Sequence, residues 1–184
     1  MYKKLLVVVD DRAVTQSAIW QGIELARFHR ADIFFFCVLP KNVFSNSDLL
    51  QVGETSPDEF ERTAREHATR LLADASALAE GAGVFCHTAT GIGADDAQCV
   101  SEAANHRHCD LIVVGTEGHN AVVRLLTGSI VSGLISIATV PVLVCRDTEA
   151  TRGSGRRASV AIRAKYRRDE RRERRERHAG EEND

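Results

Sequence analysis

The sequence lacks an apolar segment long enough to cross a membrane. Its longest apolar run covers residues 33–39, about a third of the ~20 residues that a transmembrane helix needs. The N-terminal apolar stretch, residues 5–9, is followed directly by an acid and is too short for a secretory signal peptide. These absences predict a cytoplasmic protein without membrane insertion.

The sequence also lacks the paired cysteines of common metal and redox sites. None of its five cysteines forms a Cys-x-x-Cys pair, and an odd number without a secretion signal favours reduced thiols. His106 and His108 stand two residues apart near an expected helix end, where solvated or helix-capping histidines are more common than metal ligands. The sequence therefore predicts no metal site.

Charge divides the chain into two parts. Residues 1–150 contain 12 Lys and Arg against 19 Asp and Glu, whereas residues 151–184 contain 12 against 7. The C-terminal part has almost no apolar face and cannot pack as a core element. We therefore expect a domain over residues 1–146 and a charged extension over 147–184, as a fluctuating helix or a disordered tail. This Arg-rich tail contains interleaved glutamates and no aromatic residue after Tyr166, which disfavours binding to nucleic acid. A solvated charged tail is favoured over a tail that contacts a partner protein or an acidic surface.

Apolar runs and helical periodicities alternate along the first part. The pattern predicts strands over residues 4–9, 33–39, 84–90, 110–114 and 140–145, the second of them stopped by Pro40. It predicts helices over 13–28, from the cap Ser56 and Pro57 to Gly81, over 93–107 and over 129–138. A βα alternation implies parallel strands with right-handed crossovers and helices on both faces of the sheet.

A glycine-containing segment follows the fourth expected strand. Gly115 and Gly118 are followed after nine residues by Gly128 and Ser129, just before an apolar helix pattern. Glycines let backbone N–H groups approach phosphate oxygens, and a helix N-terminus adds unpaired donors. No lysine follows Gly128, so this is not a Walker loop, and the spacing is not the dinucleotide fingerprint. The segment indicates a nucleotide site, the alternative being simple turn and helix-cap glycines.

With Asp10 at the end of the first strand, the Gly-x2-Gly-x9-Gly-Ser spacing resembles the ATP-binding signature of the universal stress protein family. The resemblance extends from Lys3 to about Arg146. It implies a three-layer α/β/α, Rossmann-like fold of the adenine nucleotide alpha hydrolase type, with a five-stranded parallel sheet, and ATP with an optional Mg²⁺ as ligand. The binding residues that it implies are Val9, Asp10, Val38, Val114, Gly115, Gly118, Gly128, Ser129 and Ile130.

The resemblance also implies roles for these residues. The Asp10 carboxylate would meet the ribose, or its backbone the adenine edge, the alternative being an acid that caps a helix or turn. Val9 and Val38 would contact the base, while the glycines and the start of the last helix would hold the phosphates. The chain departs from the family at Asp11-Arg12, where Gly-Ser is frequent. Asp11 would weaken triphosphate binding unless it points away, and Arg12 could compensate.

These features predict a nucleotide-responsive stress module rather than an enzyme. The His-x-Gly-His motif of nucleotidyltransferases and the Ser-Gly-Gly-x-Asp-Ser motif of ATP pyrophosphatases are both absent, and any ATP hydrolysis is expected to be slow and incidental. Members of the family usually dimerise through the last strand, so we expect a homodimer through residues 140–144 and an unidentified partner protein. The alternatives are a dimeric scaffold without nucleotide and a slow ATPase or adenylating enzyme of the same fold.

Overall fold

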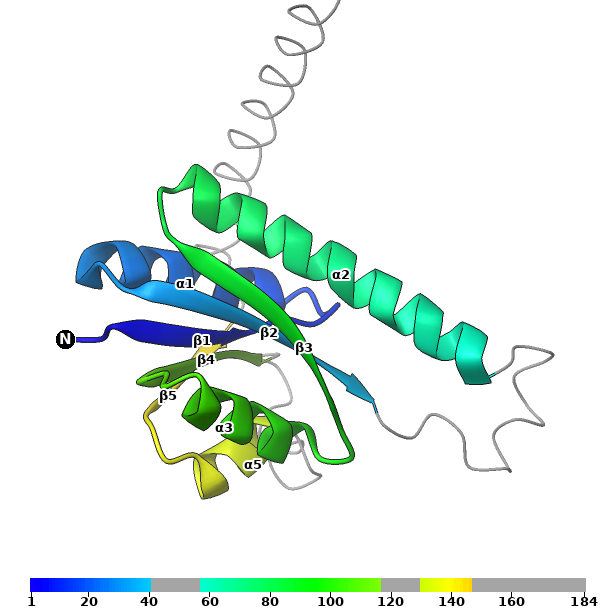
Figure 1. The fold of residues 1–184 in the computed structure, drawn as a ribbon. Helices are drawn as coiled ribbons and strands as arrows, with labels where there is room; N and C mark the ends of the chain where they lie inside the picture. Colours follow the sequence, from blue (N-terminus) through cyan, green and yellow to red (C-terminus); the bar gives the residue numbers. More distant parts are fainter. Residues whose placement is uncertain (41–56, 117–129, 147–184) are drawn as a thin grey trace, which may run out of the picture. The chain divides into compact units, whose positions relative to one another are not determined.

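The computed structural model describes residues 1–40, 57–116 and 130–146. Strands and helices alternate along these ranges, and the five strands form one parallel sheet in the order β3-β2-β1-β4-β5 (Figure 1). The expected α/β fold is therefore confirmed. The elements are β1 (Lys4–Val8), α1 (Thr15–His29), β2 (Asp32–Pro40), α2 (Pro57–Gly81), β3 (Cys86–Gly93), α3 (Asp96–His106), β4 (Leu111–Thr116), α5 (Ile130–Ile137) and β5 (Val142–Arg146).

Helices cover both faces of the sheet. Figure 1 shows α1 and α2 on one face and α3 and α5 on the other. The central strands β1 and β4 are therefore buried on both sides, which explains their uninterrupted Leu, Ile and Val runs. Their middle residues, among them Leu6, Val7, Ile112 and Val113, have no exposed surface. No helix of the described ranges is both long and apolar enough to cross a membrane.

The core beneath α3 and α5 leaves very little space between these two helices. Phe34 and Phe36 of β2 pack there with Val100 of α3 and Leu134 of α5. A Cβ placed on Gly133 of α5 would lie 2.5 Å from the Cβ of Ala97 in α3, far inside van der Waals contact. Glycine at this position therefore allows the two helices to approach each other.

The strands β2 and β3 extend further than the sequence pattern predicted. Their ladder runs from Ile33↔Cys86 to Pro40↔Gly93, so β2 ends at Pro40 as expected, with the proline as its last residue rather than the residue after it. The ladder with β1 ends earlier, at Val8↔Phe36, so at Pro40 the β1 side of the strand has no ladder to interrupt. A proline is tolerated where its missing N–H costs no ladder bond.

The extension of β3 shifts the start of α3. The sequence pattern placed the helix over 93–107, whereas the helix begins at Asp96 because Gly93 belongs to the strand. Asp95 has an extended backbone, and its side-chain oxygen accepts a hydrogen bond from the Gln98 N–H at 3.0 Å. This is the usual geometry of an aspartate N-cap, and the sequence analysis did not identify it.

Candidate functional site

The order in which strands are added to the sheet reverses between β1 and β4. The strand β1 pairs with β2 on one side and with β4 on the other, so successive βα units leave β1 in opposite directions. Ligands of open α/β sheets bind at the carboxyl ends of the strands at such a point. Asp10 follows β1 at this edge, Val38 lies near the end of β2, and Gly115 is the penultimate residue of β4.

Six of the nine expected binding residues are described, and Gly118, Gly128 and Ser129 lie outside the described residues. Val9 and Val114 are 1 % and 0 % exposed, so their side chains belong to the core and are not available to a ligand. The Val9 N–H donates to the Phe36 carbonyl at 2.9 Å. Ile130, the first residue of α5, is partly buried.

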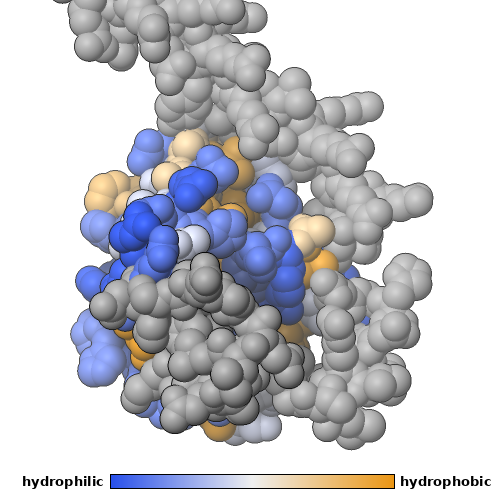
Figure 2. Space-filling model, turned by 90° about the vertical axis from the view of Figure 1, so that its right-hand side faces the viewer, coloured by the Kyte–Doolittle hydropathy of each residue, from blue (hydrophilic) through white to orange (hydrophobic). Residues whose placement is uncertain are grey.

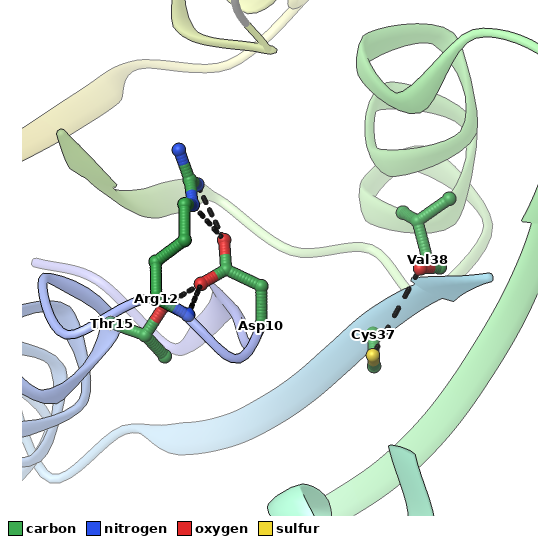
Figure 3. Close-up of polar contacts among 5 residues, drawn as sticks. All are labelled: Asp10, Arg12, Thr15, Cys37 and Val38. Carbon is green, nitrogen blue, oxygen red and sulfur yellow. Dashed lines mark hydrogen bonds and ion pairs between the residues drawn. The ribbon is translucent and has the colours of Figure 1, made fainter. Parts of the chain in front are cut away.

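Val38 and Cys37 point to opposite faces of β2 (Figure 3). The side chain of Val38 is directed to the α3 side of the sheet and packs against the edge of the core there. It is only partly buried, so it offers apolar surface at the end of the strand. Cys37 is buried on the other side, and burial raises its pKa to about 11, with further raising contributions from Asp10, Asp11 and Asp96.

The Asp10 carboxylate is bound within its own turn (Figure 3). One oxygen, Oδ1, accepts from the Arg12 N–H at 3.0 Å and from the Thr15 hydroxyl. The other, Oδ2, accepts from Arg12 Nε at 2.7 Å and from Arg12 Nη2. Asp10 thus links the end of β1 to the first residue of α1, as the turn-acid alternative anticipated.

Gly115 is explained by packing against the same connection. A Cβ on this residue would lie 2.8 Å from the carbonyl oxygen of Val14 and 3.0 Å from its carbonyl carbon. Real side chains do not make contacts this short with backbone atoms. The end of β4 therefore lies directly against the β1–α1 connection, and this requires glycine whether or not a ligand binds.

Acidic groups gather around the ends of β1 and β2 and the start of α3. Burial raises the pKa of Asp96, Asp95 raises it further, Arg12 lowers it, and Asp10 raises it. Asp96 is therefore within electrostatic reach of the Asp10–Arg12 pair, although it is distant in sequence. The sequence analysis missed Asp95 and Asp96, for which the only signal was a pair of acids before a helical pattern.

Figure 2 shows the molecule from the side on which the strands end, and hydrophilic residues make up most of the described surface at its centre. Within the described ranges, no three His, Cys, Asp or Glu side chains are grouped as a metal site would require. The described residues at this edge thus provide a partly exposed acid–arginine pair, the apolar Val38 and the closely packed backbone of Gly115.

Comparison with known proteins identifies the family. A sequence model of the universal stress protein family matches residues 1–146. The chain belongs to this family. Among curated relatives, a universal stress protein of Methanocaldococcus jannaschii is 28% identical over 148 residues, which cover 79% of this chain and 83% of the relative.

Solved universal stress proteins share the fold. UspA of Lactobacillus plantarum has a TM-score of 0.65 at 24% identity, covering 79% of this chain and 98% of the other. A universal stress protein solved in complex with cAMP has a TM-score of 0.63 at 18% identity, covering 80% and 99%. Members from Archaeoglobus fulgidus and Arabidopsis thaliana were solved with dAMP and AMP, each at 16% identity, with TM-scores of 0.55 and 0.56.

The described part of the site in this universal stress protein brings the Thr15 hydroxyl against the Asp10 carboxylate. Nucleophilic catalysis requires a nucleophile within hydrogen-bond reach of a base. The Thr15 hydroxyl donates to Asp10, but that carboxylate is also held by Arg12.

Proposed function

We propose that this universal stress protein binds ATP, with Mg²⁺ as an optional ion on the phosphates, at the carboxyl ends of its central strands. The observation that supports the proposal is that Asp10, Val38 and Gly115 lie at or near the carboxyl ends of three neighbouring strands, β1, β2 and β4, with the strand order reversing between β1 and β4. The complexes of other family members with cAMP, dAMP and AMP support an adenine nucleotide as the ligand class. In this proposal the protein is a cytoplasmic module whose nucleotide state is transmitted to a partner protein.

The proposed roles are those that the resemblance to the family implies for these positions. Asp10 meets the ribose hydroxyls and Val38 contacts the base. Main-chain groups around Gly115 line the nucleotide, since the side chains of Val9 and Val114 are buried. The segment from Gly118 through Gly128 and Ser129 to Ile130 holds the phosphates, and residues 147–184 form a separate charged extension.

Calorimetric titration with ATP, ADP and AMP tests the proposal. Asp10→Asn should weaken binding by about tenfold, because a charged acceptor is lost from the ribose. Asp110→Asn is the matched control, since Asp110 accepts from the Lys3 and Lys4 N–H groups at 2.7 and 3.2 Å, at the amino end of the sheet. If the unmodified protein releases no heat with any of the nucleotides at millimolar concentration, the proposal fails and the scaffold alternative is favoured.

Replacement of Gly115 would be a poor test of binding. A larger side chain there collides with the Val14 backbone, so lost binding would not be separable from altered packing. Mass spectrometry of ligand retained through purification avoids substitution altogether and identifies the preferred nucleotide.

We propose further that the protein is not a dedicated enzyme. Its described site residues do not pair a nucleophile with an uncompensated base, which is the support for this assignment. A turnover assay for phosphate or adenylate release decides the matter. Rates above about one per second, ordinary for enzymes, would favour the ATPase or adenylating alternative.

A homodimer through β5 is the proposed assembly. The strand β5 pairs with β4 at the end of the sheet, and its residues Val142 to Val144 are only partly buried. An edge strand with apolar side chains can extend its sheet across a two-fold axis. Sedimentation over a dilution series should show a dimer, and a monomer at micromolar concentration contradicts this assembly.

A further inference from the structure

The side chain of Arg12 is bound to Asp10, the acid of the candidate site that is proposed to meet the ribose. Its Nε donates to Asp10 Oδ2 at 2.7 Å and its Nη2 donates to the same oxygen. The two side chains are 33 % and 27 % exposed, so the pair lies at the surface of the site without being fully solvated. The backbone N–H of Arg12 also holds Oδ1.

The hydrogen-bonding capacity of Asp10 is fully used in this arrangement. A carboxylate has two oxygens with about two acceptor directions each. Oδ1 accepts from the Arg12 N–H and the Thr15 hydroxyl, and Oδ2 accepts two guanidinium N–H groups. The two contacts to Oδ1 come from the Arg12 backbone and the Thr15 hydroxyl, whereas the two to Oδ2 come from the Arg12 guanidinium. A ribose hydroxyl can therefore reach this carboxylate only by displacing the guanidinium of Arg12.

We propose, on the basis of the proposed nucleotide function, that Arg12 is a specificity-determining residue which makes the site select phosphorylated ligands over nucleosides. In the free protein its guanidinium occupies the ribose-binding oxygen of Asp10. When a nucleotide binds, the ribose replaces the guanidinium, which then pairs with a phosphate group. A nucleoside must break the same ion pair but brings no phosphate to the guanidinium.

The charges around the pair support this selection. Asp96 is within electrostatic reach of both Asp10 and Arg12, and Asp11 and Asp96 both act on Cys37 at the end of β2. Moving the guanidinium away from Asp10 leaves these acids less compensated. A phosphate offers the displaced guanidinium another anion, and its planar fork of donors fits phosphate as well as carboxylate.

The affinities of adenosine and AMP for the unmodified protein and for Arg12→Ala test the proposal. Removing the guanidinium should tighten adenosine binding about three- to tenfold, the range for losing a partly exposed charged competitor. AMP affinity should change by less than about twofold, because the lost competitor offsets the lost phosphate partner. The preference for AMP over adenosine therefore falls. Equal changes for the two ligands, or weaker adenosine binding, would overturn the proposal.

Two controls make this result specific. Arg27→Ala removes a solvent-exposed arginine from α1 that pairs with Glu24 at 3.2 Å, and it should leave both affinities unchanged. 2′,3′-Dideoxyadenosine lacks the hydroxyls that Asp10 would bind, so Arg12→Ala should not tighten its binding. A gain with the dideoxy ligand equal to that with adenosine contradicts the assignment of Asp10 to the ribose.

The outcomes separate this inference from the nucleotide function on which it rests. If the unmodified protein binds AMP but Arg12→Ala gains no affinity for adenosine, only the inference fails. If neither protein binds any of the ligands at millimolar concentration, both fail. Arg12→Lys serves if the alanine variant unfolds, because lysine keeps the charge without the fork and should give a smaller gain of the same sign.

Discussion

The close approach of Gly115 to Val14 provides the sharpest test of the structure. Gly115→Ala places a methyl group 2.8 Å from the Val14 carbonyl oxygen and 3.0 Å from its carbonyl carbon. A backbone group cannot rotate away as the end of a side chain can, so β4 or the β1–α1 connection must shift. We expect this substitution to destabilise the folded protein even when no ligand is present.

The magnitude results from two opposing terms. Overpacking of a closely packed position costs about 1–3 kcal/mol. Replacing glycine by alanine also restricts the unfolded chain, which favours folding by about 0.4–1 kcal/mol. The net loss of unfolding free energy should be about 1–2 kcal/mol, which lowers the melting temperature of a domain of this size by about 2–8 °C.

Urea denaturation of the ligand-free protein measures the effect. Gly83→Asn is the matched control, because a Cβ on Gly83 would meet nothing within 4 Å. Its φ of 73° lies in the left-handed region, which asparagine tolerates better than most residues, so this variant should lose much less stability. If Gly115→Ala is as stable as the unmodified protein, Gly115 is not required by packing and the described contact is wrong.

Three further predictions concern charge, packing and thiols. Burial and, to a lesser extent, Asp95 raise the pKa of Asp96. The folded protein therefore favours the protonated Asp96 carboxyl, and this contribution to the unfolding free energy is lost as the pH rises through the raised pKa. Asp96→Asn should therefore increase the unfolding free energy at pH 7 but not below about pH 3, as pH-dependent denaturation would show. Leu134→Ala removes a fully buried side chain and should cost about 2–5 kcal/mol in urea denaturation; a loss below 1 kcal/mol would contradict the described burial. Alkylation at pH 8, followed by mass spectrometry, should modify Cys86 and Cys99 before the buried thiols whose pKa is raised to about 11, and all should react at similar rates in denaturant.

The alternation of strands and helices could be predicted because burial restricts which residues a strand or helix can contain. Strands covered on both faces must be apolar throughout, and β1 and β4 show this as short runs of Leu, Ile and Val. The order and type of the described elements followed from these runs. The resemblance to the family and the placement of Asp10, Val38 and Gly115 at one edge also followed from the sequence.

The end of β3 could not be predicted, because glycines carry no apolar signal. Gly91 pairs with Val38 in the ladder, and a Cβ there would lie 2.4 Å from the Phe36 ring and 2.7 Å from Cys99 Sγ. The strand therefore continues through residues of low strand propensity because neighbouring side chains fill the space above them. Local propensity is overridden here by tertiary packing.

The hydrogen-bond partner of the Asp10 side chain could not be predicted from the sequence either. A carboxylate at the end of a strand can bind a ligand, cap a helix or close a turn, and spacing alone does not distinguish these roles. Arg12 was recognised as a charge that could compensate Asp11. The contact of Arg12 with Asp10 depends on the path of the backbone between Val9 and Thr15, which the sequence does not reveal.

The close approach of Gly133 to Ala97 ties the position of α5 to that of α3. A Cβ on Gly133 would lie 2.5 Å from the Cβ of Ala97, so at this point the Ala97 methyl group separates the α5 backbone from α3. A movement of α5 toward α3 at this point would have to move the α3 backbone as well, because a methyl group cannot rotate out of the way. Because Asp96 in the first turn of α3 is within electrostatic reach of Asp10, such a movement would also change the charges around the candidate site.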